Sequence, residues 1–289
     1  MGAAVATAPT CLGRVAYTVR GSGESGTCIL LHGFPESKEE FAHIADGLAS
    51  RHIRTLTPDL PGYGNESCKP QNVREYSARS IAACLRDLVH CTAGEPVAVA
   101  GHDWGGLCAT ALASIHPDSV SRLCLLNAPH LGSSTLRNIL SRSPEQLLRS
   151  WYIYAFQLPA LPERMLVSPL GVKRALMQKH STSADRAKRC SLATCGVDGQ
   201  NTWHTLAYYR SLGRGGWSES FPLPQPLRCV FGTQDPVLSP ALAKPDSTLV
   251  PHSRTIFLNK AGHFVHCDTP GAVIGQLERF VTCVDGLQD

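Results

Sequence analysis

The sequence has no hydrophobic run long enough to span a membrane and only a small excess of positive charge. No apolar stretch among its 289 residues approaches the length of a transmembrane helix. The segment 1–10 has neither the basic start nor the apolar stretch of a secretory signal. The formal net charge of +4 is spread along the chain, which argues against nucleic acid binding. We therefore expect a cytoplasmic protein with no membrane span and no nucleic acid partner.

Paired cysteine motifs are also absent, although the chain contains 12 cysteines. They are scattered, and no two of them are arranged as Cys-x-x-Cys. Cys28, Cys108, Cys124 and Cys229 lie inside apolar runs, where cysteine behaves as a small hydrophobic residue. This usage favours reduced, buried thiols over a disulfide framework, and it supports the cytoplasmic expectation.

Short apolar runs alternate with helical patterns as far as Asn127, and hydrophobic residues make up 43% of the chain. Such alternation predicts an α/β fold, with a mostly parallel sheet and helices on both of its faces. The expected strands are Arg14–Arg20, Cys28–Leu31, Ile53–Thr57, Val97–Ala100, Val120–Leu126, Leu227–Phe231 and Thr255–Leu258. The expected helices of this part are Glu39–Ala49, Ala78–His90, Leu107–His116 and Ala272–Val284.

The alternation stops in the middle of the chain. Residues 131–221 contain no good strand pattern, and Pro144–Phe156, Val172–His180 and Asn201–Ser211 are expected to be helical. The proline-rich stretch 221–227 follows, and a strand pattern resumes directly after it. We predict a core formed by residues 1–130 and 222–289, with residues 131–221 inserted as a helical cap.

A carboxylate lies between glycines where one strand pattern gives way to a helix. The segment reads Gly101-His102-Asp103-Trp104-Gly105, which is typical of a nucleophile elbow with aspartate in place of serine. A helix N-terminus keeps Asp103 ionised, and a carboxylate can attack an electrophilic carbon without a base, forming an ester with the enzyme. The alternative is a simple helix cap, which does not need glycines on both sides.

Hydrolysis of such an ester requires a base and an acid that orients it. Asp235 and His263 each follow an expected strand, in loops that would open at the same sheet edge as Asp103. Taken singly, each could be an ordinary loop residue, and His263 could join His266, Cys267 and Asp268 as a metal ligand. The order nucleophile, acid, histidine favours a catalytic triad, and we expect neither a metal nor a cofactor.

The hydrolytic step also needs two N–H donors for an oxyanion. We expect them from Trp104, directly after the nucleophile, and from Phe34 in the loop His32-Gly33-Phe34-Pro35. In that loop, His32 is expected to brace the backbone and Pro35 to stiffen it. We place His32, Pro35, His102 and Trp151 around the substrate pocket.

Four motifs together resemble the epoxide hydrolase branch of the α/β-hydrolases, over nearly the whole chain. They are His32-Gly-Phe-Pro35, Gly101-His-Asp-Trp-Gly-Gly106, Gly-Thr-Gln-Asp235-Pro and Gly262-His263. The resemblance implies an α/β-hydrolase fold with a cap, and conversion of a small-molecule epoxide and water to a vicinal diol. The reaction would pass through an ester on Asp103. We leave a homodimer open.

The cap of this branch carries two tyrosines that protonate the opening epoxide. Trp151-Tyr152-Ile-Tyr-Ala-Phe-Gln157 resembles the first cap motif, and Tyr208-Tyr209-Arg210 resembles the second. The resemblance therefore implies Tyr152 and Tyr209 as proton donors, with Tyr154 and Tyr208 as packing residues. The alternative is that Tyr152 and Tyr209 are only aromatic packing between cap and core.

Two other functions stay open. Haloalkane and fluoroacetate dehalogenases use the same aspartate, but the first type usually has Asn where Phe34 stands, and the second has Arg where Trp104 stands. A hydrolase fold reused as a ligand receptor is the non-enzymatic alternative. The loop Gly62–Pro70 is also one residue longer than is common in the family, so its conformation beside the site is an open question.

Overall fold

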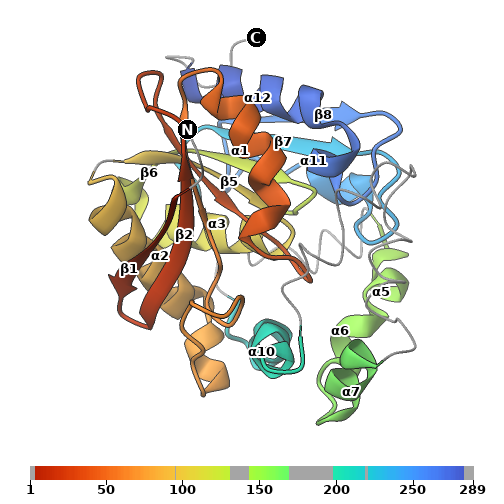
Figure 1. Cartoon of the computed structure of the whole chain (residues 1–289). Helices are drawn as coiled ribbons and strands as arrows, with labels where there is room; N and C mark the ends of the chain where they lie inside the picture. Colours follow the sequence, from red (N-terminus) through yellow and green to blue (C-terminus); the bar gives the residue numbers. More distant parts are fainter. Residues whose placement is uncertain (1–3, 95, 131–142, 169–197, 219–220, 283–289) are drawn as a thin grey trace.

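The computed structural model describes residues 4–94, 96–130, 143–168, 198–218 and 221–282. Within them lies one eight-stranded sheet in the order β1-β2-β4-β3-β5-β6-β7-β8 (Figure 1). The pairs β1–β2 and β2–β4 are antiparallel, and every other neighbouring pair is parallel. The expected α/β fold is therefore confirmed. The strands are β1 Ala4–Thr10, β2 Gly13–Arg20, β3 Thr27–Leu31, β4 Arg54–Pro58, β5 Val97–His102, β6 Val120–Leu126, β7 Leu227–Gly232 and β8 Ser253–Leu258.

Helices cover both faces of the sheet, because neighbouring side chains of one strand pack against different helices. Ile29 and Val99 pack into one core with α2 (Ala78–Thr92) and α3 (Trp104–Ile115). Leu30 and Ala98 pack into a second core with α1 (Ala42–Ala49) and α12 (Pro270–Thr282). Because neighbouring residues of a strand point to opposite faces, the central strands are apolar throughout.

The first strand is missing from the sequence predictions. β1 consists of Ala4–Thr10, a segment with three alanines and Pro9, which are residues that strands disfavour. It pairs only with β2, at the edge of the sheet, where proline is tolerated. Pairing with β2 therefore outweighs the weak propensity of this segment.

Helices occupy the interval between β6 and β7 and lie beyond one edge of the sheet (Figure 1). The expected helix Pro144–Phe156 is divided into α5 (Gln146–Arg149) and α6 (Trp151–Ala155), and Asn201–Ser211 corresponds to α10 (Thr202–Gly213). A further helix, α7 (Leu161–Val167), was not expected. The expected helix Val172–His180 and the predicted cap boundary at residue 131 lie outside the described residues.

No helix in the described ranges is long and apolar enough to cross a membrane. Cys28, Cys108, Cys124 and Cys229 are free thiols buried in the core, as their apolar surroundings indicate. Burial raises the pKa of each of these four thiols, so they stay protonated and inert.

Helix α12 is held against the sheet by Phe280, which is fully buried and lies 5.1 Å from the Arg228 guanidinium. We expect Phe280→Ala to lower the free energy of unfolding by about 3–5 kcal/mol, because it removes a buried ring and leaves a cavity. Phe280→Leu should cost clearly less. Urea unfolding measures both, and an Ala variant that loses under about 1 kcal/mol would contradict this packing.

Candidate active site

The turn between β5 and α3 holds Asp103 in a strained conformation. Its φ is 48°, a region that residues other than glycine rarely adopt. The surrounding glycines permit the turn: a Cβ on Gly101 would lie 2.3 Å from the Gly105 carbonyl oxygen, and one on Gly105 would lie 2.1 Å from the Leu31 oxygen. Backbone thus packs directly on backbone, and the Asp103 side chain is lifted out of the sheet edge.

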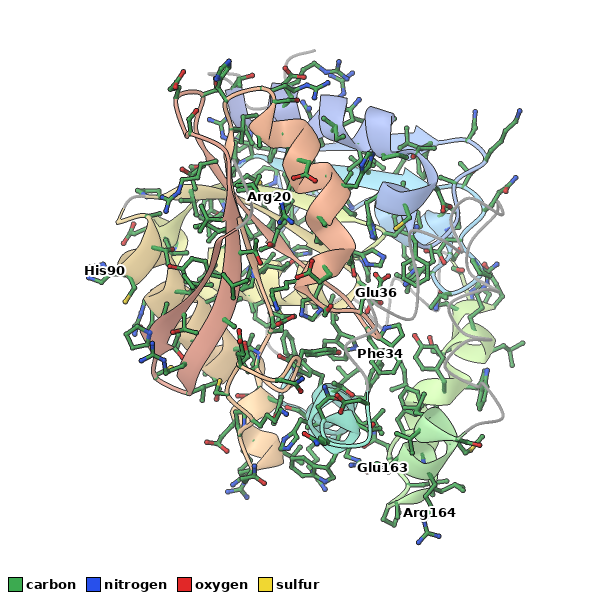
Figure 2. The ribbon with its side chains drawn as sticks, in the orientation of Figure 1. Arg20, Phe34, Glu36, His90, Glu163 and Arg164 are labelled. Atoms are coloured by element: carbon green, nitrogen blue, oxygen red, sulfur yellow. The ribbon has the colours of Figure 1, made fainter. Side chains whose placement is uncertain are left out.

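The loop after β3 reaches the same carboxylate from the other side. The Phe34 backbone N–H donates to Asp103 Oδ1 at 3.1 Å, so the loop contributes one of the two N–H groups expected to bind an oxyanion. Gly33 permits this approach, because a Cβ there would lie 2.6 Å from Asp103 Cβ. Figure 2 shows Phe34 beyond the end of β3, on the side that carries α6, α7 and α10. Trp104 begins α3 directly after Asp103, and its N–H stays the predicted second donor.

His263 lies between the two aspartates. Its Nδ1 donates to Asp235 Oδ2 at 2.9 Å, and its Nε2 lies 3.6 Å from Asp103 Oδ2. The backbone N–H groups of Val237 and Leu238 donate to the other Asp235 oxygen, which fixes the carboxylate. The three residues predicted as a triad therefore meet, although they lie far apart in the sequence.

Asn127 is a site residue that the sequence predictions missed. Its side-chain amide donates to Asp235 Oδ2 at 2.7 Å, and its Oδ1 accepts from the Gly232 N–H at 3.0 Å. It therefore links the end of β6 to the acid loop after β7. A polar residue directly after the apolar run Leu123–Leu126 was the signal that could have identified it.

The charges of the triad stabilise one another. Burial alone would lower the pKa of His263, but Asp235 and Asp103 outweigh it and hold this pKa well above its ordinary value. Burial alone would raise the pKa of Asp103, but His263 and the Phe34 N–H lower it. The same opposition between burial and His263 lowers the pKa of Asp235. The two carboxylates thus favour the charged form of His263 while Asp103 carries its negative charge.

A buried polar cluster supports the His263 loop from below. His102 Nε2 lies 3.1 Å from the His263 carbonyl oxygen, and His102 Nδ1 lies 3.0 Å from Glu40 Oε1. His266 Nε2 lies 3.2 Å from the same Glu40 oxygen. Burial and the neighbouring His263 lower the pKa of His102 to about 3, and burial lowers that of His266, so both rings are neutral.

Ligand-type atoms of this cluster lie close enough to surround a cation. One atom from each of Glu36, Glu40, His102 and His266 lies within 4.8 Å of the others. His102 Nδ1 and His266 Nε2 both lie within 3.2 Å of the same Glu40 oxygen, and His102 Nε2 contacts the His263 carbonyl oxygen, so we interpret the cluster as polar support for the His263 loop. The alternative metal set from the sequence is not brought together as one group, because the side chain of His263 contacts the triad and that of His266 contacts Glu40.

Two residues expected around the substrate pocket lie beneath the site instead. His32 and His102 are fully buried, and the Leu60 N–H donates to His32 Nε2 at 3.0 Å while His32 Nδ1 contacts the Gly33 oxygen. Their rings are used to hold loops rather than to line a cavity. Trp151 is 66% exposed in α6, and its contribution to the pocket, like that of Pro35, stays a prediction.

Tyr152 and Tyr209 belong to an aromatic cluster that includes Phe34 and Trp104, the two residues whose backbones flank the Asp103 carboxylate. The Tyr209 ring centroid lies 5.0 Å from that of Trp104, 5.3 Å from that of Phe34 and 5.9 Å from that of Tyr152. Tyr154, by contrast, is 70% exposed. The site therefore combines a carboxylate with two phenols from the inserted helices.

The residues next to these tyrosines tie α6 to α10. Gln157 Nε2 donates to the Tyr209 carbonyl oxygen at 2.8 Å, and Arg210 Nε donates to the Phe156 oxygen at 3.2 Å. Arg210 also forms an ion pair with Glu163 at 2.7 Å. The Gln and Arg of the two cap motifs therefore fix the spacing between Tyr152 and Tyr209.

Both phenols are kept protonated by their surroundings. Burial, together with the negative charges of Asp103 and Asp235, raises the pKa of Tyr152. Burial and Asp103 raise the pKa of Tyr209 well above its ordinary value. Each phenol can therefore donate a hydrogen bond beside Asp103, but neither ionises near neutral pH.

The sequence model of the α/β hydrolase fold family matches residues 27–270 of this chain. The chain belongs to the α/β-hydrolase fold family. It is 30% identical over 258 residues to the AB hydrolase superfamily protein YfhM of Bacillus subtilis, covering 86% of this chain and 87% of that protein. It is 27% identical over 270 residues to human epoxide hydrolase 4, covering 90% of this chain and 73% of that protein.

The solved structure of epoxide hydrolase A from Mycobacterium thermoresistibile has the same fold, with a TM-score of 0.76. The match covers 96% of this chain and 97% of the solved chain, and the two sequences are 23% identical. The epoxide hydrolase relative confirms the resemblance to the epoxide hydrolase branch of the α/β-hydrolases, and the solved structure shows the shared fold.

The geometry of the triad predicts the titration of His263. Because Asp103 helps to raise the pKa of this imidazole, Asp103→Asn should lower that pKa relative to the unchanged protein. NMR titration of the imidazole measures it, with the exposed Asp118→Asn as the matched control. Equal His263 pKa values in Asp103→Asn and in the control would contradict the charge coupling between Asp103 and His263.

Proposed function

We propose that this protein is an epoxide hydrolase that forms a covalent ester on Asp103. The observation that carries the proposal is the position of the Asp103 carboxylate, between His263 and the Phe34 N–H and beside two protonated phenols. A carboxylate nucleophile requires an electrophilic carbon, and phenols suit a leaving group that must accept a proton. The epoxide hydrolases among the relatives support the same reaction.

In the first step, Asp103 Oδ2 attacks an epoxide carbon and the carbon–oxygen bond of the ring breaks. Oδ2 is the oxygen that faces the site, because Oδ1 accepts from the Phe34 N–H. The departing alkoxide takes a proton from Tyr152 or Tyr209. The bond formed is an ester between Asp103 and the substrate carbon.

Formation of the ester converts His263 into a base. Once Asp103 is esterified it no longer carries a negative charge, and one of the two carboxylates that raise the pKa of His263 is lost. Burial, which lowers this pKa, is then opposed by Asp235 alone, and Asp235 still orients the ring through Nδ1. The imidazolium releases its proton, which restores the phenol that was deprotonated during ring opening, and Nε2 becomes available to accept a proton from water.

In the second step, His263 deprotonates a water molecule that attacks the ester carbonyl of Asp103. The negative charge develops on Oδ1, where Phe34 N–H and Trp104 N–H act as donors. Collapse of this intermediate breaks the bond between the carbonyl carbon and Oδ2. The departing alkoxide takes the proton of the new carboxyl group, so the vicinal diol leaves and Asp103 is again a carboxylate. The roles of Phe34, Trp104, Asp235 and His263 follow from this sequence of bonds.

The aromatic contacts favour an epoxide over a halide as the leaving group. A halide must be held by N–H donors, and the Trp104 ring is already packed edge to face against Tyr209, with the ring centroids 5.0 Å apart. The two phenols supply protons, which a departing halide does not need. Dehalogenation is therefore the competing reaction that an assay must measure.

Two further properties belong to this proposal. We propose a cytoplasmic location, supported by the buried free thiols of residues such as Cys108 and Cys229. A homodimer stays an open prediction that sedimentation of the purified protein would test.

His263→Gln should separate the two steps. Ring opening needs no base and should proceed, whereas hydrolysis should stop because water has no proton acceptor. After mixing with styrene oxide, intact-mass spectrometry should detect a gain of one substrate, and peptide mapping should place it on Asp103.

Asp235→Asn serves as the graded control and should accumulate less of this ester, because the histidine is present but poorly oriented. A folded His263→Gln protein that binds the epoxide and never carries an adduct would contradict the ester mechanism.

Tyr152→Phe and Tyr209→Phe should each slow ester formation by roughly tenfold to a thousandfold, since each removes one proton donor. The double variant should be nearly inactive. Stopped-flow fluorescence of the alkylation step measures this effect, and the exposed Tyr154→Phe is the matched control.

Unchanged epoxide opening in the double variant would return both tyrosines to a packing role. Halide release from fluoroacetate or a bromoalkane, without diol formation from epoxides, would favour the dehalogenase alternative instead.

A further inference from the structure

Two carboxyl groups and two imidazoles converge in a fully buried group beneath the His263 loop. Its members are Glu36, Glu40, His102 and His266, and one oxygen or nitrogen atom of each lies within 4.8 Å of the others. Their side chains have no exposed surface. The proposed epoxide hydrolysis uses none of these four side chains as nucleophile, base or proton donor, so it does not explain why they meet.

The members of this group follow three different strands of the sheet. Glu36 and Glu40 lie in the segment after β3, where Figure 2 labels Glu36. His102 is the last residue of β5, and His266 lies in the short helix α11 (Val265–Asp268) after β8. The group therefore joins the same three segments that carry the oxyanion loop, the nucleophile and the catalytic histidine.

The proton on His102 leaves a lone pair that faces Glu40. His102 Nε2 lies 3.1 Å from the His263 carbonyl oxygen, which can only accept, so this nitrogen carries a proton. Burial and the neighbouring His263 lower the pKa of His102 to about 3, so the ring has no second proton. His102 Nδ1 is therefore an acceptor, and it lies 3.0 Å from Glu40 Oε1, which is also an acceptor when ionised. Two acceptors this close require a proton or a cation between them.

The surroundings of His266 favour a cation. Its ring is fully buried, and neither of its nitrogens forms a hydrogen bond within the part of the chain that the structure describes. His266 Nε2 nevertheless lies 3.2 Å from Glu40 Oε1 and 3.9 Å from Glu36 Oε2. Hydrogen bonds must run along such contacts, whereas metal ligands only need to converge on one point. Buried polar groups are nearly always satisfied, so this ring indicates a bound ion.

We propose that Glu36, Glu40, His102 and His266 bind one divalent transition-metal ion such as Zn²⁺. Ligand atoms about 2.1 Å from such an ion are about 3.0 Å apart at a right angle and about 3.4 Å apart at the tetrahedral angle. The separations of 3.0 and 3.2 Å fit this range, and the contact of 3.9 Å needs only a small movement of a side chain. Imidazole and carboxylate ligands suit Zn²⁺, and the two carboxylates balance its charge.

The ion would complete the polar support of the His263 loop. Four protein ligands close the coordination sphere, which is typical of structural zinc sites. His102 donates its other N–H to the His263 carbonyl oxygen, as metal-binding histidines commonly do to a backbone carbonyl. The proposal departs from the expectation of no metal, because only the fold brings Glu40 beside the two imidazoles. It is independent of the reaction proposed above.

The test measures zinc in the full-length protein. The protein is produced in medium with added Zn²⁺ and in metal-depleted medium, and each sample passes through gel filtration in EDTA before elemental mass spectrometry. We expect one zinc per chain in the first sample and a higher Tm than in the second. Production with Co²⁺ should give the visible absorption of a nitrogen and oxygen site, whereas a thiolate-to-cobalt band would place the ion on cysteine and overturn the proposal.

Glu40→Gln and His266→Gln should each lose the retained zinc and the Tm difference between the two samples. Glu39→Gln and His43→Gln change exposed neighbours of the same segment, and as matched controls they should keep one zinc per chain. Circular dichroism verifies that each variant is folded.

A glutamine at position 40 can donate an N–H to His102 Nδ1, so it imitates a protonated Glu40. If a proton rather than a metal lies between the two residues, Glu40→Gln should keep the Tm of the unchanged protein and neither should hold zinc. That result would overturn the proposal, and so would zinc retained by the folded Glu40→Gln protein. Less than about a tenth of a zinc per chain in the unchanged protein would overturn it without any variant.

Discussion

The site depends on direct backbone packing around Asp103. Its φ of 48° is maintained because Gly101, Gly105 and Gly33 have no Cβ to separate β3, β5 and α3. The strain of this turn lifts one carboxylate to the point where the loops after β3, β7 and β8 converge. The parallel sheet makes this convergence possible, because the carboxyl ends of its strands share one edge.

Electrostatics links the two steps of the proposed mechanism. Asp235 and the ionised Asp103 raise the pKa of His263, and in the proposal an esterified Asp103 no longer contributes to this effect. The proposed nucleophile would thereby control when its own base becomes available. The buried cluster around Glu40 keeps the His263 loop in place through His102 while these charges change.

The sequence predicts the central strands, the elbow and the triad, because each is encoded by a local pattern of apolar runs and glycines. β1 was missed because its alanines and Pro9 carry no strand signal and its structure comes from pairing with β2. Asn127 and Glu40 were missed because their roles arise only from contacts with distant residues. His32 and His102 were placed at the pocket because the sequence does not distinguish a ring beside the substrate from one beneath it.

A single turnover in heavy-oxygen water tests the ester on Asp103 most directly. If the Asp103 carboxylate opens the epoxide, one of its own oxygens enters the first diol, and the oxygen from water remains on Asp103. The account therefore predicts a labelled Asp103 peptide and an unlabelled first diol, both measured by mass spectrometry. Label in the first diol and none on Asp103 would mean that water attacks the epoxide directly, and it would contradict the account.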